Sequence, residues 1–224
     1  IPPIRTFNAR LGIDEATFIR ERKGSYKLGI EFVNWRRIGD RYFHPFGQYG
    51  AEFDWVPFYQ YWMREHLAGR DVGDISDYCM AWAAARENKF EPPMADPRNI
   101  RSRHDYAYHF DAGLLGDFLK EYALNKGVSH QIGTVANVEC HEHTINSLKL
   151  DDGNTLSADF FIDCSGFRGL LGKQALLRKF TSYADTLFND AAVAIASDAT
   201  ASPETALQTR SIALSHGWQW HIPL

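Results

Sequence analysis

The segment SADFFIDCSGFRGLL, residues 157–171, joins an apolar run to residues that suit a phosphate ligand. The run FFI is apolar on both faces, which predicts a central strand of a sheet covered on each side. Ligands of open α/β sheets bind where such a strand ends. There, glycines let the backbone approach a pyrophosphate and an arginine meets its charge. The residues at this corner are Asp163, Ser165, Gly166 and Arg168. A simple tight turn is the alternative, because short glycine motifs often occur without a ligand.

A lysine interrupts a second apolar segment, GSYKLGIEFVNW at residues 24–35. Apolar residues alternate with Lys27, Gly29 and Glu31, which predicts a strand with one apolar face. Lys27 then points away from that face, beside the bare backbone of Gly29. A solvated surface lysine is the ordinary alternative. Glu31 shares the Lys27 face by alternation, so we expect it either to pair with the lysine or to be solvated.

Aromatic residues gather in RYFHPFGQYG, residues 41–50, and in GWQWHIPL at the end of the chain. A spacing of two places Trp218 and Trp220 on one face of a strand, although core packing would also explain them. His44 and Phe46 offer an imidazole and a ring, and ring contacts contribute about 0.5–1.5 kcal/mol beyond burial. A loop histidine bonded to backbone and a core phenylalanine are the alternatives.

The elements that position these residues follow from local signals. We expect a helix over residues 9–22 entered at Asp14, and a helix-like stretch over 56–69. The polar segment 88–105 carries three prolines and predicts a surface connection or lid. A helix capped by Asp111 should end at Gly127. Strand-like runs follow in 128–140, 145–150 and 157–164, with the turn DDGN at 151–154.

Composition limits the classes of partner. The chain has 224 residues, a formal net charge of −4 and 14% aromatic residues, which favours a small, flat molecule over nucleic acid or an anionic membrane. Three cysteines without a CxxC pair predict neither a disulfide framework nor a zinc site, and a cytoplasmic location. Alternation would place His141 and His143 on one face of a strand, but without a third ligand we expect no metal. The sequence sets no oligomeric state.

Several motifs together resemble a known family. The order of a capped helix, a strand through Val135, a hairpin and the Asp163 corner is similar to the FAD domain of aromatic-hydroxylase-type flavoproteins, with Cys164-Ser165-Gly166 in place of their Asp-Gly. With FHPFG, YHFDAGLLGDFL and GSYKLGIEF added, the whole chain resembles the flavin-dependent tryptophan halogenases. Their W-x-W-x-I-P signature is matched by Trp218, Trp220, Ile222 and Pro223.

The resemblance implies an α/β FAD-binding flavoprotein fold of the aromatic-hydroxylase type with an inserted substrate region. In that reading, residues 1–105 form the substrate-side region, 106–175 part of the FAD domain and 176–224 a substrate-side sheet segment. The family's N-terminal GxGxxG is absent, and its glutamate base and halide segment should lie beyond residue 224, so we expect an incomplete, inactive fragment.

The resemblance also implies roles. FAD, reduced by a separate flavin reductase, would with O2 and chloride or bromide give hypohalous acid, which Lys27 relays to a small aromatic substrate such as tryptophan or another indole. The substrate would contact His44, Phe46 and Gly47. FAD would contact Val135, Asp163, Ser165, Gly166 and Arg168, and the W-x-W-x-I-P residues would lie beside the flavin. A flavin-dependent hydroxylase and a non-catalytic aromatic-binding module remain open as alternatives.

Overall fold

The computed structural model describes residues 3–197 and 206–224, which fall into two compact units. The first unit comprises residues up to Leu119 together with those from Ala196 onward, and the second comprises Lys120–Ile195. Two parts of the predicted regions lie outside the described ranges: residues 1–2 of the region 1–105, and residues 198–205 of the region 176–224. The two units are defined by how the chain packs and not by function. The functional division into residues 1–105, 106–175 and 176–224 therefore stays a prediction.

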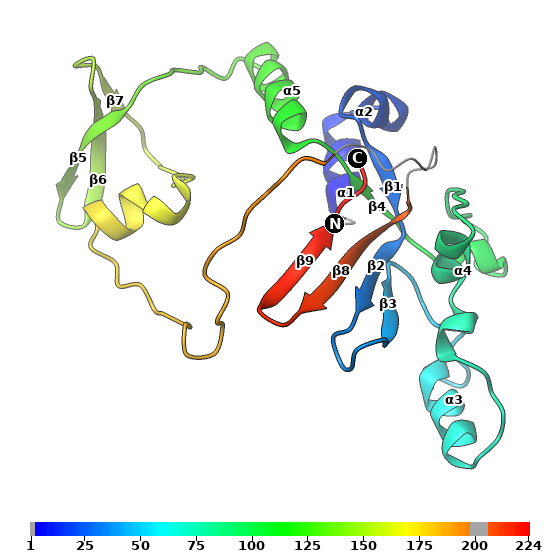
Figure 1. Ribbon diagram of the computed structural model, residues 1–224. Coiled ribbons are helices and arrows are strands. Elements are labelled where there is room, and N and C mark those ends of the chain that lie inside the picture. The colour runs from blue at the N-terminus through cyan, green and yellow to red at the C-terminus, as the bar shows by residue number, and fades with distance from the viewer. Residues whose placement is uncertain (1–2, 198–205) are drawn as a thin grey trace. The chain divides into compact units, whose positions relative to one another are not determined.

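A four-stranded sheet dominates the first unit (Figure 1). Its order is β3 (Arg41–Pro45), β2 (Gly29–Val33), β8 (Gln208–Leu214), β9 (Gly217–His221). The β2 strand runs antiparallel to β3 and parallel to β8, and β8 pairs antiparallel with β9. Strand β9, near the end of the chain, is therefore separated by β8 from β2, the strand that follows Lys27.

A separate pair of strands, β1 (Ser25–Lys27) and β4 (Ala107–His109), runs antiparallel. The single strand predicted over 24–35 is therefore wrong: the chain leaves one sheet and enters another at Leu28. The Leu28 N–H donates to the Leu207 carbonyl at 2.7 Å, and its carbonyl accepts from the Phe46 N–H at 2.8 Å. Because these partners are distant in sequence, alternation alone could not reveal the change of sheet.

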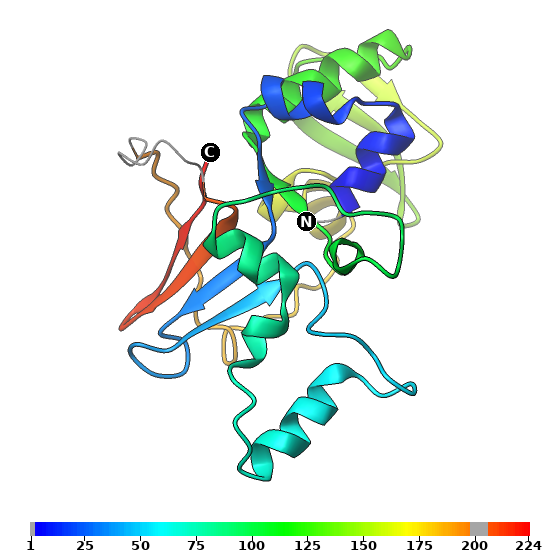
Figure 2. The same cartoon turned by 90° about the vertical axis from the view of Figure 1, so that its right-hand side faces the viewer.

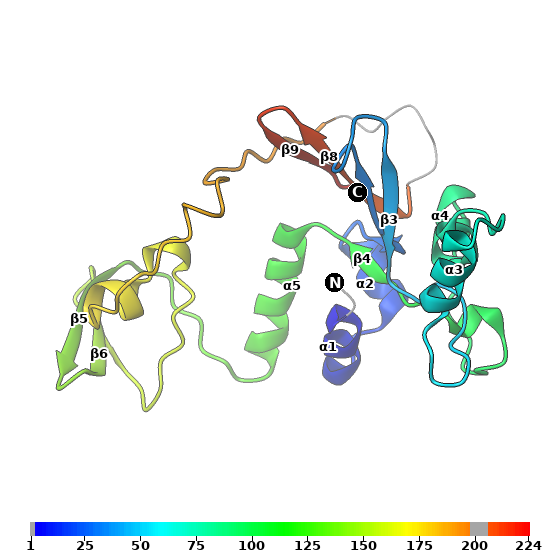
Figure 3. The ribbon, with the colours of Figure 1, turned by 90° about the horizontal axis from the view of Figure 1, so that it is seen from below.

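Two short helices, α1 (Pro3–Leu11) and α2 (Glu15–Glu21), lie beside the β1–β4 pair (Figures 1 and 3). The Asp14 carboxylate caps α2 by accepting from the Thr17 N–H at 2.8 Å, as predicted. The single helix predicted over 9–22 is wrong, because α1 ends before Gly12, whose φ of +71° favours glycine.

Further helices follow β3 along the chain, and one of them packs on the sheet. The aromatic stretch forms α3 (Phe58–Leu67), which confirms the helix expected there, and η1 (Ile75–Tyr78) leads into α4 (Met80–Arg86). The α4 helix lies against the β3 side of the sheet (Figure 2), where Trp82 stacks on Phe43 with ring centres 4.5 Å apart. The polar segment 88–105 carries only the short turn η2 (Ile100–Ser102), in agreement with the predicted connection.

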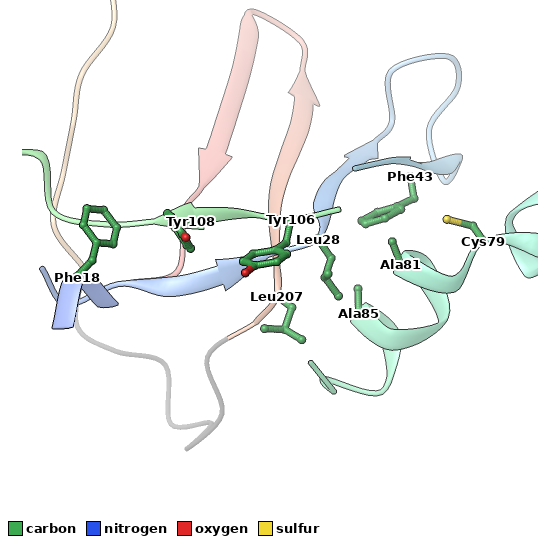
Figure 4. Close-up of a cluster of buried hydrophobic side chains, with 9 residues drawn as sticks. All are labelled: Phe18, Leu28, Phe43, Cys79, Ala81, Ala85, Tyr106, Tyr108 and Leu207. Carbon is green, nitrogen blue, oxygen red and sulfur yellow. The ribbon is translucent and has the colours of Figure 1, made fainter. Parts of the chain in front are cut away.

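The core of the first unit lies where these elements meet (Figure 4). Leu28 is 1% exposed at the point where the chain changes sheet, and full burial of a leucine stabilises by about 1.5–3 kcal/mol. The Tyr106 and Tyr108 hydroxyls donate to the Glu15 carboxylate, which ties α2 to β4. The cluster consists of Phe18, Leu28, Phe43, Cys79, Ala81, Ala85, Tyr106, Tyr108 and Leu207.

Helix α5 (Ala112–Asn125) contains the boundary between the units. The Asp111 carboxylate accepts from the Gly113 and Leu114 N–H groups at 2.8 and 3.0 Å, and Gly127 follows the helix with a φ of +86°. Both the cap and the stop agree with the sequence prediction. Local capping chemistry is thus sufficient to set the ends of this helix.

The second unit contains an antiparallel sheet of β5 (Val135–His141), β6 (Thr144–Leu150) and β7 (Thr155–Ser157). The predicted turn at 151–154 joins β6 to β7. Glu142 and His143 have φ of 47° and 66° and form the turn between β5 and β6. The prediction that His141 and His143 share a strand face is therefore wrong.

The central strand predicted at FFI, residues 160–162, is also wrong. Residues 158–165 carry neither helix nor strand, and Phe160 and Ile162 are 80% and 78% exposed. Within the described part of the chain no strand pairs with this segment, and a β ladder requires such a partner. The 3₁₀ helix η3 (Gly166–Arg168) and the π-helix η4 (Leu170–Ala175) follow.

None of the helices in residues 3–197 and 206–224 combines the length and apolarity of a membrane span.

Candidate functional site

Lys27 is the last residue of β1 and is half-buried. Its Nζ lies 5.8 Å from the centre of the Phe46 ring, within range of a cation–π contact. Burial lowers the pKa of the Lys27 amine, because desolvation disfavours its charged form. The structure therefore gives this lysine an environment that a solvated surface lysine lacks.

The residues on either side of Lys27 face the core, as the alternation predicted. Tyr26 stacks on Phe90 with ring centres 3.8 Å apart, and Leu28 is buried. The amine thus projects from the opposite face of the strand. Packing on both sides of Lys27 restrains the backbone from which the amine extends.

Glu31 has a different role from either expectation. Its side chain is 4% exposed and accepts from Arg41 Nη1 at 2.9 Å and from Arg210 Nε at 2.7 Å. It neither pairs with Lys27 nor is solvated, because the sheet change at Leu28 breaks the alternation between them. The ion pairs join β2 to its two neighbours, β3 and β8.

The FHPFG segment, which begins in β3 and continues beyond it, lies against the lysine strand. The Phe46 N–H bonds to the Leu28 carbonyl, and Gly47 forms a bridge with His104. A Cβ at Gly47 would lie 2.8 Å from the Arg103 carbonyl oxygen, so only glycine permits this approach. Phe46 is half-buried and outside the core cluster, which argues against the core alternative.

His44 is exposed on β3, opposite Ile30 of β2. This position in a strand contradicts the alternative of a loop histidine satisfied by backbone. The structure brings Phe46 to Lys27. The assignment of substrate contacts to His44, Phe46 and Gly47 stays a prediction.

The two tryptophans of the W-x-W-x-I-P signature lie on one face of β9, as predicted. The ring centres of Trp218 and Trp220 are 4.8 Å apart, and the side chains are 40% and 53% exposed. They stand outside the core cluster, so core packing does not explain them here. Ile222 and Pro223 follow the strand, and the Pro223 carbonyl accepts from Ser25 Oγ at 3.4 Å. The signature therefore ends beside the strand that carries Lys27.

His109 lies within the motif YHFDAGLLGDFL, but the sequence assigned no role to this histidine. His109 is 4% exposed and lies between Ser25 Oγ, 3.1 Å from Nδ1, and Thr209 Oγ1, 2.9 Å from Nε2. Burial and the charge of Lys27 lower its pKa to about 3, so the ring is neutral at ordinary pH. Strand pairing sets Ser25 opposite His109, whereas Thr209 comes from β8 of the other sheet.

The second candidate region is the corner after residue 162, in the second unit. The Asp163 carboxylate accepts from Ser165 Oγ at 2.6 Å and from the N–H groups of Ser165, Leu171 and Gly172 at 2.9–3.1 Å. Ser165 Oγ in turn accepts from the Leu170 N–H at 2.7 Å. The carboxylate therefore organises the loop itself.

The corner also has groups that fit a phosphate-bearing cofactor. Gly166 and Gly169 have φ of +65° and +53°, and no atom lies within 4 Å of a Cβ built at Gly166. The Arg168 side chain is exposed, so its guanidinium can meet an anion, while half-buried Val135 begins β5 in the same unit. The Leu171 and Gly172 amides are already bonded to Asp163. The assignment of FAD contacts to these residues stays a prediction.

Low pH should weaken the hydrogen bonds that the Asp163 carboxylate makes within this loop. Hydrogen bonds from the Ser165 hydroxyl and N–H, and from the Gly172 and Leu171 amides, lower the pKa of Asp163 to about 2. Because the folded pKa lies below the ordinary aspartate value of 3.8, the carboxylate stabilises the fold above that value, and the contribution disappears as pH falls through 3.8 towards 2. We expect the Gly172 amide resonance to titrate near pH 2 in NMR spectra.

Two variants control this measurement. Asp163→Asn should abolish the acid transition at Gly172, whereas Ser165→Ala should move its midpoint upward because the largest contribution is lost. A transition of the unchanged protein at the ordinary carboxyl pKa would contradict the geometry.

The fold that holds these sites is the fold of flavin-dependent halogenases. The structure of BrvH, a flavin-dependent halogenase from Brevundimonas sp. BAL3, matches with a TM-score of 0.94 and 37% identity, over 100% of this chain and 46% of that chain. The tryptophan halogenase family model matches residues 1–224. The chain therefore belongs to the tryptophan halogenase family, and both this recognition and the α/β fold class are confirmed.

Curated relatives agree. The tryptophan 6-halogenase ThaL of Streptomyces albogriseolus is 34% identical over 98% of this chain and 44% of its own length. The tryptophan 7-halogenase RebH of Lentzea aerocolonigenes is 34% identical over 100% of this chain and 45% of its own length. The chain thus spans less than half the length of these relatives.

Proposed function

We propose that the whole protein containing these residues is an FAD-dependent halogenase that installs chloride or bromide on an electron-rich aromatic ring, such as tryptophan or another indole. Family membership supports this proposal, as do the names of the relatives, which specify tryptophan positions. The observation that carries it is the half-buried Lys27 amine beside Phe46. Both residues belong to sequence motifs that resemble those of the family.

Lys27 supplies an amine that can hold an oxidised halogen. Bound reduced FAD, with O2 and halide, would supply hypohalous acid. The amine holds this acid by a hydrogen bond, or an N–X bond forms as the O–X bond breaks and water leaves. A lone pair on nitrogen is needed for the second route, and the lowered pKa increases the fraction of neutral amine at a given pH.

Transfer to the substrate completes the relay. The halogen passes to a ring carbon, the bond from nitrogen to halogen breaks, the nitrogen regains a proton and the ring loses one to a base. Phe46 can stack on the substrate ring and His44 can contact its edge, which fixes the carbon presented to the halogen. Gly47 lets that loop approach closely.

The remaining assignments concern the cofactor and its supply. Ser165, Gly166 and Arg168 would meet the FAD phosphates, Asp163 would hold the loop that carries them, and Val135 would contact FAD from the same unit. The W-x-W-x-I-P residues, Trp218, Trp220, Ile222 and Pro223, would form a wall beside the flavin. A separate flavin reductase would deliver reduced FAD. The free cysteines, Cys79, Cys140 and Cys164, suit the reducing cytoplasm in which we place the protein.

The decisive assay supplies the whole protein with chemically reduced FAD, O2, bromide and an indole, and weighs the product by mass spectrometry. We expect a brominated ring. Bromide replaced by nitrate is the matched control and should give no halogenated product. A product heavier by oxygen instead of bromine would favour the hydroxylase alternative.

The non-catalytic alternative is tested separately from turnover. An aromatic-binding module should bind no flavin, even as the whole protein. Titration of FAD into the whole protein, followed by quenching of flavin fluorescence, should show saturable binding. Arg168→Ala should weaken it if the corner meets the cofactor's phosphates, whereas absence of any binding would favour the module.

A further inference from the structure

A chain of hydrogen bonds links three separate segments of the first unit through His109. Its Nε2 lies 2.9 Å from Thr209 Oγ1 of β8, and its Nδ1 lies 3.1 Å from Ser25 Oγ of β1. Ser25 Oγ also donates to the Pro223 carbonyl at 3.4 Å. The links span 84, 100 and 198 residues of sequence. The imidazole thus stands between the lysine strand and β8, and the Ser25 hydroxyl continues the chain to the end of the W-x-W-x-I-P signature.

The contact between Ser25 and Pro223 assigns a direction to the chain. The Pro223 carbonyl can only accept, so this contact takes the single Ser25 hydroxyl proton. Ser25 Oγ then accepts from a proton on His109 Nδ1. A neutral imidazole with that proton has a lone pair on Nε2, which accepts from the Thr209 hydroxyl. All of these donors are satisfied in one tautomer.

Burial makes this arrangement costly to disturb. His109 and Thr209 are 4% and 2% exposed, so water cannot replace a lost partner. A doubly protonated imidazole would have to donate from Nε2 and would leave the Thr209 hydroxyl to find another acceptor. It would also place a second positive charge on the face of β1 that carries Lys27.

The strand register puts His109 near Lys27. Ser25 is opposite His109 and Lys27 is opposite Ala107, so all four side chains lie on one face of the β1–β4 pair. Lys27 and His109 are diagonal neighbours on that face, close enough for the charge of Lys27 to lower the pKa of His109. His109, which anchors β1, therefore lies on the same face of the strand pair as the Lys27 amine.

We propose that His109, as the neutral Nδ1–H tautomer, is a positioning residue that locks the Lys27 strand to the end of the W-x-W-x-I-P segment. Its consequence for catalysis rests on the proposed halogenase function. The chain of bonds sets where the relay amine stands relative to Trp218 and Trp220 without touching substrate or cofactor. The tautomer itself is independent of the reaction.

The tautomer is tested first, by NMR of the whole protein with 15N-labelled histidine side chains. His109→Asn identifies the resonances of the ring by their loss. We expect a proton on Nδ1 and a bare Nε2 at neutral pH, with loss of the Nδ1 hydrogen-bond signature in Ser25→Ala. A proton on Nε2, or a doubly protonated ring, would overturn the proposal whether or not the protein halogenates.

The positioning role is tested by the yield of halogenated indole per reduced flavin consumed. Removing the link in Ser25→Ala or Thr209→Val should lower this yield about tenfold or more, because misplacement of a reacting group by about 1 Å can cost as much as 10²-fold. Flavin oxidation should continue at its normal rate. His109→Asn keeps an N–H donor for Ser25 and should retain more of the yield than His109→Leu.

A matched control separates positioning from loss of stability. Tyr108→Phe removes a hydroxyl from the opposite face of the same strand, where it bonds to Glu15 at 2.6 Å. It should lower the melting temperature with little change in yield. The positioning role fails if Ser25→Ala and Thr209→Val keep the normal yield, or if Tyr108→Phe loses as much of it as they do. Failure of the halogenase function would appear instead as no halogenated product from the unchanged protein.

Discussion

Replacement of Lys27 by alanine in the whole protein should reduce ring halogenation by at least about 10²-fold while oxidation of reduced flavin continues. The amine is the half-buried group that can hold an oxidised halogen beside Phe46, and its lowered pKa favours the neutral form needed for a bond to halogen. Without it, hypohalous acid would form but would escape or react at random. Brominated indole and oxygen uptake are measured in the same reaction.

Two further variants make this result specific. Lys27→Met keeps a long side chain against the loop but has no amine, so it should fail as Lys27→Ala does. Lys149→Ala removes an exposed lysine from another strand, β6, and should halogenate normally. Normal halogenation by Lys27→Met would remove the amine from the mechanism. Parallel loss of flavin oxidation would show that the substitution disturbs the cofactor as well.

Simultaneous replacement of Arg41 and Arg210 by methionine should lower the free energy of unfolding by about 3–5 kcal/mol. Both guanidiniums are partly exposed, at 59% and 42%, but the Glu31 carboxylate between them is 4% exposed. Replacing either arginine alone leaves Glu31 with one partner. The loss should be small, because a partly exposed ion pair contributes about 0–1 kcal/mol. Loss of both leaves a buried charge without compensation, so the effect of the double variant exceeds the sum of the single ones. Urea unfolding measures all three.

The triple variant with Glu31→Leu is the control. Replacing a buried ionic group by an apolar side chain of similar volume is often neutral, so this variant should recover most of the lost stability. Recovery would show that the cost lies in the isolated carboxylate and not in the arginine stems. A double variant whose free energy of unfolding stays within about 1 kcal/mol of the original would mean that water reaches the Glu31 carboxylate once both arginines are gone.

Elements fixed by neighbours in sequence agreed with the sequence-based prediction. Asp14 and Asp111 cap their helices because each acceptor lies within three residues of its donors. The turn at 151–154 depends on its own residues. The common face of Trp218 and Trp220 follows from the period of a strand alone. The conjunction of motifs likewise identified the family, because a family pattern is a property of sequence.

Features that depend on distant partners required the tertiary structure. Arg210, which holds Glu31 in the sheet, lies 179 residues away from it, and Thr209 lies 100 residues from His109. No local period shows that the chain changes sheet at Leu28. Because of this change, the Glu31 side chain is buried between Arg41 and Arg210 and does not share a face with Lys27. The apolar run at 160–162 read as a buried strand but has no strand beside it in the described residues. Local chemistry decides where helices and turns begin, whereas burial and charge pairing depend on which distant segments pack together.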